Sequence, residues 1–418
     1  MSAQVTDVDV PAAGDTAGIG QAVRDYWARV RGGDIGSLPA VLGLIALVIL
    51  FGALEGSTFL SIFNFANLIN QSAAIIVLAM GLVFVLLLGE IDLSAGFAAG
   101  TSAAILAVAL NSWGVAWPVA LLAALLTGAV IGLSIGLLVA RLGIPSFVVT
   151  LAMFLALQGA MLLIIGEGGT IPIRSDAILV VMNGNMSVVA GWVLAVIIVV
   201  GFALSTLLAI RRRRKAGLPA EAMSVWAIKV ISLGALIFVA TYLLNQERQL
   251  PTAKVTIQGV PWVVVVILVL LVGLTFILQR TGFGRHVYAV GGNREAARRA
   301  GINVKGLMIT CFIFCSTLAA IAGVLLASRD NSVSPTTGGA QTLLFAVGAA
   351  VIGGTSLFGG RGKIRDAVIG GLVIAVIANG LPLITQQSGI QFIVTGLVLL
   401  VAASVDAISR RRTAATGS

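Results

Sequence analysis

The sequence predicts an all-α fold: a polytopic helical membrane protein with about twelve transmembrane helices, on the evidence of composition and apolar-run length. Of 418 residues, 59% are hydrophobic and 10% are charged, whereas soluble domains carry about 25% charged residues. The apolar runs are about 16–24 residues long, which suits a bilayer core about 30 Å thick. The 50 glycines fit this class, because glycine lets membrane helices approach closely. These numbers argue against a soluble fold.

The distribution of basic residues supports the number of crossings. An even number of spans puts both termini on one side of the membrane. All of the 26 Lys and Arg residues then fall on that side, except Arg174, Arg248, Lys254 and Arg329. Because cytoplasmic loops are enriched in Lys and Arg, both termini are expected in the cytoplasm, with the chain crossing the plasma (cytoplasmic) membrane. The expected spans are 39–54, 72–88, 95–110, 117–140, 146–166, 187–210, 226–244, 260–279, 306–327, 341–354, 367–385 and 391–408.

The chain divides into a transmembrane domain at 38–408 and two polar cytoplasmic tails, at 1–37 and 409–418. The first tail has no apolar core, so no cleavable secretion signal is expected. Between Ile19 and Val30, apolar residues recur at helical spacing with arginines between them. This pattern predicts a helix that lies in the membrane interface, in contact with lipid.

Two segments of the transmembrane domain differ from plain spans. Segment 55–71 contains Asn64, Asn67 and Asn70 at three-residue intervals, which predicts a polar stripe on an outward-facing interfacial helix. Segment 211–259 begins with five consecutive basic residues and adds an extra helix pair. Each segment interrupts the regular succession of spans.

Two stretches, 89–96 and 353–360, resemble each other at a constant offset. Each ends an apolar run and precedes another helix, and glycine-rich backbone near membrane depth is typical of broken or re-entrant helices. Two interpretations stay open: these residues shape a solute path or its cytoplasmic gate, or they cap and pack helices. In the second interpretation Asp92 or Ser94 caps one helix and Thr355 or Ser356 the other. The polar candidates are Glu90, Asp92, Ser94, Thr355 and Ser356.

Residues 281–305 form a polar island between two long apolar runs. Asn293 can cap a helix there, Glu295 lies in its first turn, and Gly301 can end it in the left-handed conformation. A helix over 294–300 is too short to be stable alone, so the ends of the bundle or a partner must hold it. A plain charged loop that only sets topology is the alternative. The five basic residues and the only histidine of the chain are Arg285, His286, Arg294, Arg298, Arg299 and Lys305.

The order Glu295-Ala296-Ala297, three residues, then Gly301 resembles the coupling loop of importer-type ABC permeases. The wider stretch, from Gly284 and Arg285 through Asn293, resembles the monosaccharide branch of that family, and the resemblance covers most of 38–408. It implies an ATP-driven sugar permease whose short coupling helix sits in a cleft on the ATPase. The implied coupling residues are Gly284, Arg285, Asn293, Arg294, Glu295, Ala296, Ala297, Arg298 and Gly301.

The resemblance also implies partners: ABC ATPase subunits, an extracytoplasmic sugar-binding protein and a second copy of the permease. The insert at 211–259, with Leu243-Leu244-Asn245, is similar to xylose permeases. Stretch 89–96 is similar to a family signature, although Glu90 stands where the family usually has Gly. The implied path or gate candidates are Asn67, Asn70, Glu90, Asp92, Ser94, Thr355, Ser356 and Asn379; for Asn379 an interhelical hydrogen bond is the other interpretation.

Two further features are interpreted as packing. Gly128, Gly132 and Gly136 form a small-residue ridge at four-residue spacing, which predicts a helix-packing face. Cys311 and Cys315 lie one turn apart in an apolar run, which indicates two small core residues.

The sequence lacks the motifs of several other functions. No phosphate-binding loop with its lysine is present, so ATP hydrolysis is expected on a separate chain. No cofactor or metal motif occurs, no catalytic pair supports an intramembrane enzyme, and topology explains the net charge of +10 without nucleic acid. A secondary transporter of a small polar solute is the main alternative, but acidic residues at membrane depth, which ion-coupled carriers use, are scarce. An ABC permease for a non-sugar substrate also stays open.

Overall fold

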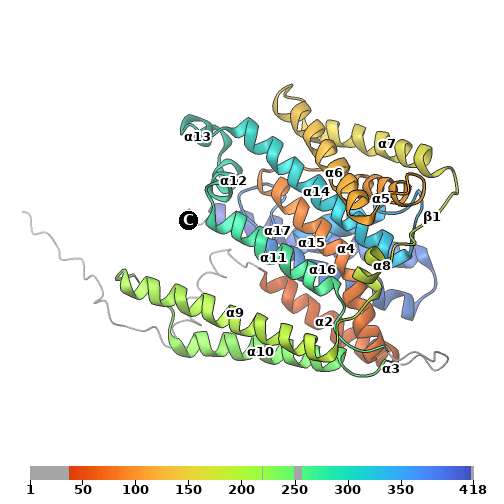
Figure 1. Ribbon diagram of the computed structural model, residues 1–418. Coiled ribbons are helices and arrows are strands. Elements are labelled where there is room, and N and C mark those ends of the chain that lie inside the picture. Colours follow the sequence, from red (N-terminus) through yellow and green to blue (C-terminus); the bar gives the residue numbers. More distant parts are fainter. Residues whose placement is uncertain (1–36, 219, 249–256, 416–418) are drawn as a thin grey trace, which may run out of the picture.

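The computed structural model describes residues 37–218, 220–248 and 257–415. The predicted interfacial helix within 1–37 lies outside the described residues. The described chain is almost wholly helical (Figure 1). Its helices are α2 (Leu38–Leu54), α3 (Gly56–Phe59), α4 (Ile62–Leu87), α5 (Ala95–Asn111), α6 (Trp117–Ala140), α7 (Ser146–Ile165), α8 (Asp176–Asn183), α9 (Val188–Lys215), α10 (Met223–Leu244), α11 (Val263–Arg280), α12 (Gly282–Gly292), α13 (Arg294–Arg299), α14 (Val304–Asp330), α15 (Gly339–Gly353), α16 (Ile364–Ile384) and α17 (Ser388–Ala415). Strands β1 (Ile171–Pro172) and β2 (Ser332–Val333) pair antiparallel.

The helices confirm the predicted fold class. Among the described residues, 8 helices are long and apolar enough to cross a membrane, and four shorter apolar helices accompany them. Together they correspond one for one to the predicted spans. Helices α2, α5 and α15 are 17, 17 and 15 residues long, and the fourth apolar stretch, Ser388–Val401, belongs to the 28-residue helix α17.

The separate interfacial helix predicted over 55–71 is wrong. Only α3 is separate, and residues from Ile62 onward are the first turns of the 26-residue helix α4. Ser61 caps this helix by accepting a hydrogen bond from the Asn64 backbone N–H at 3.2 Å. The asparagine stripe does not lie along an open interface, because the Asn64 side chain is buried against another helix.

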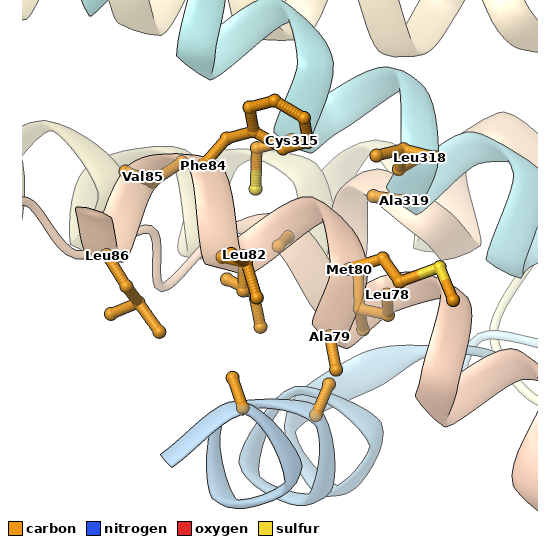
Figure 2. Packing of buried hydrophobic residues seen from close by; sticks show 14 of the residues in the cluster. Leu78, Ala79, Met80, Leu82, Phe84, Val85, Leu86, Cys315, Leu318 and Ala319 are labelled. Carbon is orange, nitrogen blue, oxygen red and sulfur yellow. The ribbon is translucent and has the colours of Figure 1, made fainter. Parts of the chain in front are cut away.

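Helices α4 and α14 form the centre of the bundle. In their most apolar windows, 78% of α4 and 67% of α14 is buried, so both helices are surrounded by protein. Figure 2 shows Phe84 of α4 beside Cys315 of α14, with Leu318 and Ala319 over neighbouring turns. The Phe84 ring also stacks on Phe314 at 4.8 Å. Cys311 and Cys315 are free and fully buried, which confirms their interpretation as core residues.

The glycine ridge of α6 is confirmed as a helix-packing face, and it packs against α14. A Cβ at Gly128 would overlap the Ser316 carbonyl oxygen, and one at Gly132 would overlap the Phe312 carbonyl oxygen. At Gly136 a Cβ would lie 2.7 Å from the Ile309 Cα. Three successive turns of α6 therefore touch the backbone of α14 directly.

Helices α9 and α10 form a hairpin at one edge of the bundle (Figure 1). Only 11% of the apolar window of α9 and 17% of that of α10 is buried, so their apolar side chains are available to lipid. Among the described residues, α10 is the one helix that lies wholly within 211–259, because α9 begins at Val188 and continues through the basic run 211–215.

The bundle has two distinct ends (Figure 1). Helices α12 and α13, and the basic end of α9, lie at one end, which we call the α13 end. The β1–β2 pair and α8 lie at the other. The two stretches that resemble each other, 89–96 and 353–360, fall largely in the loops 88–94 and 354–363, which connect helices at the α13 end.

Candidate functional site

Helix α13 is formed by the residues that the sequence marked. Asn293 caps it, accepting a hydrogen bond at its Oδ1 from the Ala296 N–H at 2.9 Å. Gly301 follows with φ of 84°, the left-handed conformation that glycine adopts at low cost. The backbone N–H groups of Gly301 and Ile302 bond back to the carbonyls of Arg298 and Ala297. Both predicted caps are confirmed, and the helix ends at Arg299, one residue earlier than expected.

Helix α13 presents most of its surface outward. Ala297 is buried at 5% exposure, whereas its other residues are exposed. Ala296 and Ala300 are among the exposed residues, so Ala297 is the one alanine of this stretch that packs on the bundle. Glu295 accepts hydrogen bonds from Arg298 at 2.9 Å and Arg299 at 3.1 Å. The Arg298 hydrogen bonds, followed by that of Arg299, lower the pKa of Glu295, so its charge is retained on this open surface.

Helix α12 precedes α13 and was not predicted. Thr281 caps its start at 3.3 Å, and Val287 and Val290 are buried. The signal was present in the spacing of Phe283, Val287 and Val290, which recur at three and four residues. Gly284 is buried where a Cβ would overlap the Leu278 carbonyl oxygen, so it holds α12 on α11.

Helix α12 joins both resembling loops. A Cβ at Gly291 would overlap the Leu87 carbonyl oxygen at the end of α4. That same oxygen accepts a hydrogen bond from the Gly360 N–H at 2.9 Å. The Tyr288 hydroxyl donates to the Gly362 carbonyl at 2.7 Å, and burial, with a smaller effect of the Asp366 charge, raises the pKa of Tyr288. We call residues 87–94, 288–294 and 355–362 the loop junction.

One ion pair connects α13 to the loop junction. The Arg294 Nη1 lies 3.1 Å from Glu90 Oε1, and its Nη2 lies 2.6 Å from Met308 Sδ on α14. The Glu90 side chain is 15% exposed and the Arg294 side chain 55%. Arg294 is exposed like Arg285, Arg298 and Arg299, but it alone of these four has an ion pair with a residue outside α13 among the described residues.

The other polar candidates at the α13 end are buried inside the loop junction. Asp92 Oδ1 accepts hydrogen bonds from the Ser94 N–H at 2.9 Å and its hydroxyl at 2.6 Å, just before α5. Ser94 is the N-cap residue of α5, but its side chain makes no capping hydrogen bond there, so the capping interpretation is not confirmed for this loop. Thr355 and Ser356 do not cap α16, so that prediction is wrong. That helix begins later, at Ile364, and Asp366 accepts the Lys363 N–H at 2.7 Å.

The remaining candidates lie at the opposite end. Asn379 and Asn64 exchange two hydrogen bonds, at 2.8 and 2.9 Å, and Asn379 also donates to Gln71 at 3.3 Å. Asn379 thus makes an interhelical hydrogen bond, which was one of its two interpretations. Asn67 and Asn70 are half-buried on the same part of α4. Residues 70 and 87 are separated by about 26 Å of helix, so the structure groups the candidates at two ends.

A surface hollow of about 360 Å³ lies beside α13, between α12 and the start of α14. Both apolar and polar side chains line it. Among the described residues, no group of three or more His, Cys, Asp or Glu side chains could hold a metal ion. The hollow is lined by Phe283, His286, Ala300, Gly301, Ile302, Asn303, Leu307 and Thr310.

Comparison with known proteins finds relatives over most of the chain. A family described as branched-chain amino acid transport system / permease component matches residues 64–403. The xylose transport system permease protein XylH of Haemophilus influenzae is 36% identical over 90% of this chain and 98% of its own length. The Escherichia coli protein of that name is 34% identical, over 89% and 92%. The ribose import permease protein RbsC of Bacillus subtilis is 32% identical, over 90% and 94%. No solved structure matches.

Proposed function

This chain belongs to the family described as branched-chain amino acid transport system / permease component, and from that premise we propose that it is the membrane-spanning subunit of an ATP-driven ABC importer for a monosaccharide. Xylose is the first choice of substrate. The observation that carries it is the similarity to two xylose permeases over about nine-tenths of the chain. Ribose or another pentose, a hexose or a non-sugar are the alternatives within the same class.

Helix α13 is proposed as the surface that the ATPase subunit holds. Its caps keep it folded, its outer face is open, and the hollow beside it can take a partner's side chain. Arg285, Arg298 and Arg299 are exposed cations suited to charged contacts. Glu295 orders two of these arginines on the α13 surface, which fixes their direction before the partner arrives.

The proposed mechanism is a coupling of two equilibria. ATP binding closes the ATPase pair and moves α13, which shifts the packed helices from one access state to the other. The shift can be no larger than the difference in ATP affinity between the two states. The permease would act as a pair of chains, with both termini and α13 in the cytoplasm, fed by an extracytoplasmic sugar-binding protein.

Reconstitution in liposomes tests this function. The purified chain, a xylose-type ATPase subunit and a xylose-type binding protein are combined, and uptake of radiolabelled xylose is measured with unlabelled ribose, glucose or leucine as competitors. We expect uptake only with all three components and ATP. Gradient-driven uptake by the chain alone would instead identify a secondary transporter, and competition by leucine but not by sugars would place the substrate outside the sugars.

A further inference from the structure

The ion pair between Arg294 and Glu90 is the only one by which a charged residue of α13 reaches outside its own helix among the described residues. Arg298 and Arg299 are both paired with Glu295, four residues away or fewer. Arg294 and Glu90 are 204 residues apart in sequence. This ion pair therefore depends on how α13 is placed against the bundle, whereas the other two form within the helix itself.

The geometry of the pair favours a defined position over a loose surface contact. The Glu90 side chain is mostly covered, at 15% exposure, so its carboxylate has little freedom to follow a moving partner. Arg294 is held from a second side, because its other terminal nitrogen contacts Met308 of α14. One guanidinium thus spans the loop before α5 and the helix after α13.

Glu90 lies in the loop that joins the buried helices α4 and α5, so a displacement of its side chain would act on the centre of the bundle. It follows Leu87, the last residue of the buried helix α4, and precedes Asp92, which is fully buried and bonded to Ser94 at the start of α5. Displacement of Glu90 therefore acts on the ends of α4 and α5 together. The Gly291–Leu87 contact of α12 is a backbone packing contact that moves with any rotation of α12, whereas the charge pair is specific to α13.

We propose that Arg294 and Glu90 are positioning residues that transmit movement of α13 directly to the loop between α4 and α5. In this proposal Arg294 contacts the loop between α4 and α5, and the other exposed charged residues of α13 make the contacts to the ATPase. This inference rests on the proposed function, since it needs a motor that moves α13. It adds a specific connection between that motor and two central helices.

The test measures sugar molecules taken up per ATP hydrolysed in the complete reconstituted complex. Glu90→Gln removes the negative charge with little change of shape, and Arg294→Gln removes the positive charge together with the guanidinium that contacts Met308. We expect each to lower that ratio by about fivefold or more, the lower end of usual coupling between sites. We expect the double variant to be no worse than either single one, and the exchange Glu90→Arg with Arg294→Glu to recover most of the ratio.

Glu221→Gln is the matched control. Glu221 also pairs with a cation, Lys229, but on the α9–α10 hairpin, and its replacement should leave the ratio unchanged. If Glu90→Gln accumulates poorly in membranes, Arg294→Gln serves instead, because its parent side chain is 55% exposed. A parent-like ratio in both single variants, or losses that multiply in the double variant, would overturn the inference.

The two proposals fail in different ways. If the unchanged chain takes up no sugar with ATP, or does so without an ATPase, the proposed function fails. If the unchanged chain couples uptake to ATP and the Glu90 and Arg294 variants couple equally well, the transmission route alone is wrong. Copurification of the ATPase subunit with each variant distinguishes the two roles of Arg294 further. Loss of the ATPase from the Arg294→Gln variant would mean that Arg294 contacts the ATPase and does not act through Glu90.

Discussion

At the scale of single residues, the buried amide pair Asn64–Asn379 shows how polar groups are accommodated inside this apolar bundle. Each side chain donates to the other, and Gln71 accepts the remaining hydrogen of Asn379. A buried amide without a partner is costly, whereas replacing both partners with apolar groups is far less so. The pair is therefore a unit that is preserved or replaced together.

We predict that Asn64→Leu and Asn379→Leu each lower the free energy of unfolding in detergent, and that the double variant loses less than their sum. The interaction energy should be about 0.6–1.7 kcal/mol, the range of interhelical hydrogen bonds in membranes. The free energies of unfolding of the parent, the two single variants and the double variant form a double-mutant cycle that gives this interaction energy. Strictly additive losses would argue against the pair, and lost uptake in Asn379→Leu at parent stability would assign Asn379 to the solute path.

Gly301 provides the left-handed residue that follows the end of α13, and its replacement tests whether this cap matters for uptake. Open space surrounds the Cβ position there, so only its φ of 84° limits replacement. Gly301→Val should strain the backbone by about 1–2 kcal/mol, on the order of tenfold in the population of the capped helix, and ATP-driven uptake should fall. Gly301→Asn should keep most uptake, because Asn tolerates this conformation. Equal uptake in both variants would show that the cap plays no part in coupling.

Local features of this kind could be predicted from the sequence, and distant ones could not. The caps Asn293 and Gly301 act on backbone within a few residues, so spacing alone identified them. The Asn64–Asn379 and Arg294–Glu90 contacts join residues 315 and 204 positions apart, and no periodicity carries that information. The spacing did show that Asn64 and Asn379 are polar residues in apolar surroundings, but not that they meet.

At the scale of elements, direct backbone contact between α6 and α14 is the feature that most constrains packing. Long apolar runs located the spans, because hydrophobic length is read from the chain itself, although α4 begins at Ile62, ten residues before the predicted start of its span. Helix α12 was not predicted, because the polar island was interpreted from its charges, although Phe283, Val287 and Val290 follow helical spacing. The cap of α16 was assigned wrongly, because Asp366, and not Thr355 or Ser356, makes the hydrogen bond at its start.

We predict that Gly132→Ala lowers the free energy of unfolding by about 1–3 kcal/mol, the usual cost of an overfilled core. Its Cβ would overlap the Phe312 carbonyl oxygen, so α6 and α14 must separate. Gly201→Ala is the matched control within α9, where nothing lies near the Cβ, and alanine should be neutral or improve the helix by up to about 1 kcal/mol. A similar loss in both variants would mean that helix packing at the ridge is not the cause.

At the scale of the whole molecule, the twelve apolar helices of the described residues and the α13 end define how the chain is expected to lie in the membrane. All but four Lys and Arg residues fall on one side when the spans alternate, and α13 is on that side. The central claim of the account is that α13 is a cytoplasmic surface held by a separate ATPase. Side chains with the right exposure are available to test it.

The most direct measurement is thiol labelling of Ala296→Cys with a reagent that cannot cross membranes. Ala296 is exposed on α13, and Cys311 and Cys315 are fully buried, so the new thiol should react alone. We predict labelling in inside-out vesicles, none in intact cells, and protection when the ATPase subunit is bound. Labelling from the outside of intact cells, or the same labelling with and without the bound ATPase, would contradict the account.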